Sequence, residues 1–216
     1  MYINIFKLVI VYFQFELPLF SDLTKNYPGF FHFGGDFRNH EIADLLEIND
    51  RSKLLRHDTT ALRMSYTLNT IGQQHSLGTE VIRLSRFGTD SVSGKNGVQY
   101  IFHPLAFGPY LADKYGYPSV TKMHLSDPEK TKDVFKNKQG VMRVITYTQK
   151  DNEPKGHVLL WDCSDFYQAR DYFYGHTLLS VEFWESPGKG WGQFVFEVVY
   201  MCLIYKRVTH SIISAF

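Results

Sequence analysis

The sequence has few cysteines and no grouping of residues that is typical of a metal site. Its 216 residues include only Cys163 and Cys202, with no Cys-x-x-Cys pair and no paired His and Cys cluster. A zinc site therefore has no support, and two cysteines do not indicate the disulfide framework of a small secreted domain. We expect no metal and no other cofactor, whereas a single disulfide and the cellular compartment both stay open.

An excess of charge of either sign is also missing. Lys and Arg total 23 against 22 Asp and Glu, which gives a formal net charge of +1. Proteins that bind nucleic acids through phosphate contacts usually carry a clear basic surplus, so we expect no nucleic acid partner. Aromatic residues, in contrast, reach 16%. This surplus suits either a β-rich core or a cleft that binds peptides or carbohydrates.

No apolar run is long enough to span a membrane, which takes roughly 20 residues. Residues 1–19 are strongly apolar, but Gln14 and Glu16 interrupt them, and they lack the basic start and small-residue cleavage site of a signal peptide. We therefore expect one domain at 20–186 between two apolar extensions, at 1–19 and 187–216. The N-terminal extension is predicted to be an added strand or amphipathic segment, with a degenerate targeting sequence as the alternative.

The clearest helical pattern lies at residues 60–72. Apolar side chains recur there at spacings of three and four, which places them on one helix face: Ala61, Met64, Leu68 and Ile71. Asp58, Thr59 and Thr60 come at its start and are suited to accept the unpaired amide protons of the first turn. Thr60 therefore lies where the helix dipole points at whatever occupies the site. By itself, the pattern is that of a capped core helix.

The rest of the chain alternates between helical and extended patterns. We predict two further helices, at 41–48 and 104–116. Four short segments rich in β-branched and aromatic residues are predicted as strands: 98–103, 140–147, 156–161 and 178–184. Two polar segments are predicted as a long loop and a surface excursion: 72–97 and 121–138. Early helices followed by a set of antiparallel strands indicate an α+β fold.

Several segments, in order along the chain, resemble the motifs of one family. Residues 58–69, DTTALRMSYTLN, are similar to the NTCAIRMSxALN signature of the type VI secretion amidase effectors, fourth group. Residues 156–162, GHVLLWD, resemble the GHxxLWxG motif of that family, and 100–118 resemble its strand and following helix. Shorter similarities occur at 26–29, 140–147 and 181–186. The resemblance covers roughly residues 20–186 and implies a papain-like (NlpC-type) amidase fold, with N-terminal helices packed on an antiparallel sheet.

The resemblance also implies a function. Members of that family cleave bacterial peptidoglycan stem peptides between γ-D-glutamate and meso-diaminopimelate, with a Cys, a His and an Asp. They are delivered by a secretion apparatus to the periplasm of the target cell and are blocked by dedicated immunity proteins. For this chain, the implied partners are therefore peptidoglycan peptides and a cognate immunity protein, and the resemblance implies that it is secreted or delivered to the target-cell periplasm.

The family motifs map onto individual residues of this chain. The His of the GHxxLW motif is His157, the expected base of the site. The family Asp follows that His by about eleven residues, where this chain has Gln168, so Asp165 is the expected third member and Asp171 the alternative. The nucleophilic Cys aligns with Thr60. A threonine hydroxyl does not ionise at neutral pH, and a helix dipole worth about 0.3–1 kcal/mol cannot change that.

Three hypotheses about function follow from the threonine. The chain is an amidase impaired by the replacement of Cys by Thr60, natural or introduced, or one that works slowly through Thr60. Alternatively, it is a binding module that holds a peptidoglycan peptide without cleaving it. The third hypothesis is an interaction protein on the same fold, whose apolar ends mediate assembly. In the first two cases we expect a Thr60→Cys variant to gain cleavage.

Overall fold

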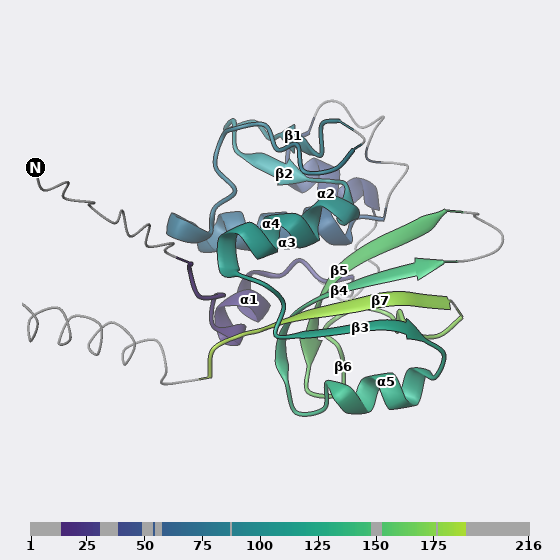
Figure 1. Cartoon of the computed structure of the whole chain (residues 1–216). Helices are drawn as coiled ribbons and strands as arrows, with labels where there is room; N and C mark the ends of the chain where they lie inside the picture. Colours follow the sequence, from purple (N-terminus) through teal and green to yellow (C-terminus); the bar gives the residue numbers. More distant parts are fainter. Residues whose placement is uncertain are drawn as a thin grey trace, which may run out of the picture.

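Figure 1 shows the computed structural model of the chain, which describes residues 14–30, 39–48, 54, 58–86, 88–147, 153–175 and 177–188. Most of both predicted extensions, namely residues 1–13 and 189–216, lie outside the described residues, and so does Cys202. The roles of the extensions and the limits of the domain therefore stay predictions.

A five-stranded antiparallel sheet is the centre of the fold, with the strand order β3-β7-β4-β5-β6 (Figure 1). Its strands are β3 (Val120–Leu125), β4 (Gln139–Tyr147), β5 (Pro154–Asp162), β6 (Asp165–Phe166) and β7 (Thr177–Glu185). β4 and β5 pair along their whole lengths. β6 pairs only with Trp161 and Asp162 at the end of β5, so the rest of that edge of β5 is available to another element.

Helices cover one face of this sheet. They are α1 (Phe20–Asn26), α3 (Thr60–Ile71) and α4 (Pro104–Tyr115). A small sheet of β1 (Ser91–Ser93) and β2 (Gln99–Ile101) comes between α3 and α4 in the chain, and α2 (Asn39–Leu45) packs on this small sheet and on α3. Gly72 and Gly116 follow α3 and α4 with φ angles of 76° and 86°, a conformation that favours glycine. α5 (Pro128–Val134) covers the opposite face (Figure 1).

The strands contribute alternate residues to two cores, because successive side chains point to opposite faces of a sheet. On the helix side, α1, α3 and α4 pack against buried residues of three strands: Val141, Val158, Leu160 and Trp184. The opposite core is mainly aromatic and lies under the segment around α5: Phe135, Trp161, Phe166, Tyr172, Phe173 and Phe183. Both faces of β5 are therefore buried, which fixes its position relative to α3.

The predicted α+β fold is confirmed. All seven predicted helices and strands correspond to elements of the structure, namely α2, α3, β2, α4, β4, β5 and β7. The predicted surface excursion at 121–138 is wrong, because it contains most of β3 and all of α5. β3 is an edge strand with largely exposed side chains, so it carries no apolar alternation, and the seven-residue α5 is too short to show a helical period.

The predicted long loop at 72–97 is wrong in part. It contains β1 and one turn of 3-10 helix at Gln73–His75. Asp90 organises the segment, since its Oδ2 accepts hydrogen bonds from the backbone N–H groups of Leu84 and Ser85 at 2.7 Å each. Hydrogen bonds to individual polar side chains, rather than a repeating apolar pattern, hold this segment in place. The spacing of apolar residues in the sequence therefore does not predict its structure.

An ion pair fixes α4 on the sheet. Arg143 of β4 binds Glu182 of β7 at 2.8 and 2.6 Å, and its Nη1 donates to the backbone oxygen of Leu105 at 3.2 Å. That oxygen is available because Pro109, four residues later in α4, has no N–H to donate to it. Gly108 leaves room for the guanidinium, since a Cβ there would lie 2.4 Å from Arg143 Cζ.

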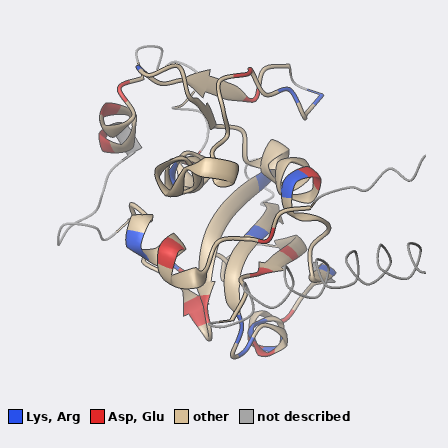
Figure 2. Ribbon diagram, turned by 90° about the vertical axis from the view of Figure 1, so that its left-hand side faces the viewer, with Lys and Arg blue, Asp and Glu red and all other residues tan. Residues whose placement is uncertain are grey.

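The distribution of charge agrees with the balanced composition. Figure 2 shows Lys and Arg interspersed with Asp and Glu over the described elements, rather than gathered by sign. Within the part of the chain that the structure describes, none of the helices has the length and apolar character needed to cross a membrane.

Candidate active site

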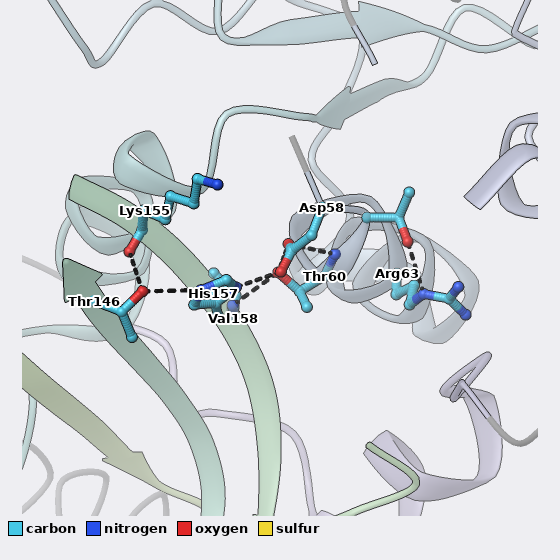
Figure 3. Close-up of polar contacts among 8 residues, drawn as sticks. Asp58, Thr60, Arg63, Thr146, Lys155, His157 and Val158 are labelled. Atoms are coloured by element: carbon cyan, nitrogen blue, oxygen red, sulfur yellow. Dashed lines mark hydrogen bonds and ion pairs between the residues drawn. The ribbon is translucent and has the colours of Figure 1, made fainter. Parts of the chain in front are cut away.

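The first turn of α3 lies against the edge of β5 that β6 leaves open. Thr60, the first residue of α3, is completely buried there, and its Oγ1 accepts a hydrogen bond from the backbone N–H of Val158 at 3.1 Å (Figure 3). This bond satisfies a strand amide that would otherwise be buried without a partner. The contact brings position 60 and His157, the residue before Val158, into one site.

Asp58 holds the hydroxyl of Thr60 from the other side. Thr60 Oγ1 donates to Asp58 Oδ1 at 2.6 Å, and the backbone N–H of Thr60 donates to the same oxygen at 3.2 Å. Asp58 therefore accepts the first N–H of α3 from two residues before the helix, whereas the N-cap residue, Thr59, makes no side-chain capping bond and Thr60 is already helical. The single proton of the hydroxyl goes to Asp58 and a lone pair receives Val158 N–H, so both hydrogen-bonding functions of Thr60 are used.

His157 lies on β5 and contacts the same carboxylate. Its Nδ1 is in hydrogen-bond contact with Asp58 Oδ2, and its Nε2 lies 3.2 Å from Oγ1 of Thr146 on β4 (Figure 3). The ring also packs on Tyr172, with centroids 4.4 Å apart. The side chain of His157 is 6% exposed and that of Asp58 is 21% exposed, so this pair lies at the boundary between solvent and the core.

The environment favours the ionised form of Asp58. Burial alone would raise the pKa of this carboxyl, but the hydrogen bond and the charge of His157, with two hydrogen bonds from Thr60, outweigh burial and lower it. The buried guanidinium of Arg63 also interacts electrostatically with Asp58. A carboxylate, an imidazole and a buried hydroxyl thus form one connected network.

Arg63 fixes the N-terminal end of α3 relative to the preceding segment. Its Nε donates to Thr59 Oγ1 at 3.0 Å, and its Nη1 donates to the backbone oxygens of Pro28 and Gly29 at 2.7 and 3.2 Å. The guanidinium also lies 4.0 Å from the ring centroid of Phe30. Sequence reasoning did not single out Arg63, because it lies near Thr67 and Thr70, away from the predicted apolar face of the helix.

Asp165 and Asp171 lie together, but on a different partner. Lys132 of α5 is 3.0 Å from Asp165 Oδ1 and 2.6 Å from Asp171 Oδ2. The side chain of Asp165 is 68% exposed. The structure therefore brings Thr60 and His157 together through Asp58, and it places Asp165 and Asp171 on Lys132 instead. Sequence reasoning did not predict Asp58 as a member of the site. Its position before the helix is already accounted for by a capping role, which uses only one of its two carboxylate oxygens.

Gln168 lies beside the turn that Arg63 holds. Its backbone oxygen accepts from Phe30 N–H at 2.8 Å, and its Nε2 donates to the hydroxyl of Tyr167 at 3.2 Å. Two buried polar atoms of this region have no hydrogen-bond partner among the described residues: Tyr27 Oη and Gln168 Oε1. Such atoms are costly unless something satisfies them, and Tyr27 interacts electrostatically with both Asp58 and Arg63.

The site contains an imidazole and an ionised carboxylate but no ionisable nucleophile. In the described part of the chain, no three His, Cys, Asp or Glu residues are placed to hold a metal ion. Cys163 is a free thiol in the turn after β5, where burial and Asp162 raise its pKa. It is therefore poorly suited to form a thiolate.

Solved structures share this fold. The type VI effector Tae4 from Enterobacter cloacae is 17% identical, with a TM-score of 0.61, and the similarity covers 81% of this chain and 100% of that one. Tae4 of the Tae4–Tai4 effector–immunity complex from Salmonella Typhimurium is 21% identical, with a TM-score of 0.56, over 80% of this chain and 100% of that one. A search of curated proteins finds no match.

A family model gives the same result from the sequence. The model for type VI secretion system (T6SS) amidase effector protein 4, Tae4, matches residues 56–184. The match begins just before Asp58 and includes Thr60, His157 and the helices and strands that position them. Because it spans more than half of the sequence, the chain belongs to the type VI secretion system amidase effector protein 4 family.

Proposed function

We propose that this protein recognises peptidoglycan stem peptides at the γ-D-glutamate–meso-diaminopimelate bond, and that its ability to hydrolyse this bond is impaired. One observation carries the second part of the proposal. The side chain at the nucleophile position, Thr60, is fully buried, and its hydroxyl is engaged by Asp58 and Val158. A nucleophile must instead reach a substrate carbonyl at about 3–3.5 Å, which a fully buried hydroxyl does not do.

His157, the proposed base, does not assist Thr60 in this arrangement. Its two ring nitrogens contact Asp58 and Thr146. The proton of the Thr60 hydroxyl goes to a carboxylate, whose low basicity makes it a poor general base for an alcohol. Slow turnover through Thr60 is therefore the less favoured of the two enzymatic hypotheses.

Binding without cleavage is a second candidate function, and the partial exposure of Asp58 favours it. The side chain of Asp58 is 21% exposed, so its carboxylate is within reach of a ligand at the edge of the site. A peptide offers amide N–H groups that donate to such an acceptor. We also propose the target-cell periplasm as its place of action and a cognate immunity protein as its protein partner, since solved relatives were crystallised with the immunity protein Tai4.

The test is a chromatographic digest of purified peptidoglycan of the diaminopimelate type, with calorimetric binding of a purified stem peptide. We expect wild type and Thr60→Ala to release no fragments above background, and wild type to bind the peptide. Thr60→Cys should gain cleavage, and Thr60→Cys with His157→Ala should lose it again. Cleavage by wild type that disappears in Thr60→Ala would contradict impairment. Neither binding nor cleavage by any variant would favour the interaction-protein hypothesis.

A further inference from the structure

A nucleophile and its base need to be in direct contact. In this site, Asp58 lies between the residues at those two positions and binds both. We propose that Asp58 is a positioning residue that limits how far His157 and the helix amide of residue 60 activate a nucleophile at position 60. Removal of its charge, and not only a Thr60→Cys change, is then required for efficient cleavage. The cleavage measurement that tests this inference rests on the proposed function. The measurement of thiolate formation does not depend on it.

The first step of the argument concerns the proton on His157. Nε2 faces Thr146 on β4, so Nδ1 is the ring nitrogen on the side of α3. A carboxylate only accepts hydrogen bonds, so the contact with Asp58 requires Nδ1 to carry its proton. A nitrogen that donates to Asp58 has no lone pair with which to accept a proton from a side chain at position 60.

The second step concerns charge. Asp58 Oδ1 lies 2.6 Å from Thr60 Oγ1, so the sulfur of a cysteine at position 60 would adjoin a carboxylate oxygen. A like charge at this distance opposes formation of a thiolate. The thiol would keep its proton and donate it to Asp58, as the Thr60 hydroxyl does now.

The third step concerns the helix. A thiolate at the start of a helix is stabilised by the free N–H groups of the first turn. Here the N–H of Thr60 already donates to Asp58 Oδ1 at 3.2 Å. Asp58 thus receives two of the donors that a thiolate at position 60 would use, namely the imidazole N–H and the amide of residue 60, and leaves the amide of Val158.

The surroundings keep Asp58 in this role. The groups that interact with its carboxylate are His157, Thr60, the guanidinium of Arg63 and the phenols of Tyr27 and Tyr172. Arg63 is directed at Thr59, Pro28 and Gly29 by its own hydrogen bonds. The lowered pKa of Asp58 agrees with a permanent carboxylate.

The experiment compares full-length Thr60→Cys with the double variant Asp58→Asn, Thr60→Cys. Formation of the new thiolate is followed by its ultraviolet absorbance against pH, as a difference from wild type, which contains Cys163 and Cys202 but has threonine at position 60. We expect the double variant to form at least tenfold more thiolate at pH 7, and to release peptidoglycan fragments at least tenfold faster. Equal thiolate formation in the two proteins would overturn the inference.

A matched control and a second measurement keep the result unambiguous. Asp113→Asn combined with Thr60→Cys removes an exposed carboxylate of α4 and should behave as Thr60→Cys alone. Should the Asp58→Asn protein not fold, Thr60→Cys alone decides: its thiolate should form only near or above pH about 8.5, the ordinary value for cysteine, and a thiolate present at pH 5 would refute the inference. The expected thiolate difference without any cleavage would leave the inference intact and contradict the proposed function.

Discussion

Asp58 and His157 are 99 residues apart in the sequence, and the contact of Asp58 Oδ2 with His157 Nδ1 joins the segment just before α3 to the middle of β5. The other oxygen of the same carboxylate binds Thr60. The site is therefore defined by a carboxylate that bridges helix and strand, rather than by a direct contact of Thr60 with His157. Its integrity should depend on the ionisation of Asp58.

Replacement of Asp58 by Asn should lower the free energy of unfolding by about 1.5–3 kcal/mol at pH 7, because it weakens hydrogen bonds to a charged group. The pKa of Asp58 in the folded protein lies below its ordinary 3.8, so its contribution is present above that pH and is lost as the pH falls through the lower folded value. Urea unfolding between pH 2 and 7 measures this. A stability gap that stays constant to pH 2 would contradict the pairing, and Asp165→Asn is the exposed control.

Replacement of Arg63 by Met should cost at least about 2 kcal/mol of unfolding free energy, because the backbone oxygens of Pro28 and Gly29 would lose a buried charged donor. The measurement is denaturant unfolding at pH 7, with Lys130→Met as a control at an exposed position. A loss below about 0.5 kcal/mol, the range of ordinary surface changes, would show that Arg63 does not hold α3 in place.

Replacement of Gly108 by Ala should destabilise the protein by about 1–3 kcal/mol, the usual cost of overpacking. The new Cβ would lie 2.4 Å from Arg143 Cζ and displace it from Glu182. Asp113→Ala, an exposed change in the same helix, controls for helix propensity. Thermal unfolding compares the two. A Gly108→Ala protein as stable as wild type would mean that Arg143 can move at no cost.

Lys114 predicts a dependence of stability on alkaline pH. Burial lowers its pKa from 10.5 to about 8, so the unfolded chain binds more protons between these values. Stability should therefore rise with pH from about 8 to 10.5, relative to a Lys114→Met variant that contains the same tyrosines. Unfolding of both proteins in urea across this range measures the difference. A difference that is flat or falls with pH would contradict a buried lysine.

The sequence predicts the parts of this fold that have long, regular patterns. The apolar spacing of Ala61, Met64 and Leu68 identifies α3, and all three side chains are buried. The run of apolar residues around Val141 and Val144 identifies β4, because both faces of that strand are packed against other parts of the chain. β3 and α5 escaped prediction because an exposed edge strand and a seven-residue helix bury too little to show a period.

The site is less accessible to sequence reasoning than the fold. The motif places Thr60 and His157 in the chain, but the residue that joins them depends on how α3 meets β5, which no local pattern encodes. Asp165 was expected on His157 from its distance along the chain, whereas Lys132 attracts it. A carboxylate next to a helix start can cap and pair at the same time, and only the tertiary structure distinguishes the two roles.

Pro109 has a consequence for how α4 is seated. A helix that packs only through apolar side chains can turn about its axis by small angles at little cost, because neighbouring apolar residues replace one another. In α4, the oxygen of Leu105 is released by Pro109 and accepts from Arg143. Any rotation of α4 would withdraw that oxygen from the guanidinium and leave it with no donor from the helix itself. A residue that weakens the helix thereby sets a single rotational position for it on the sheet.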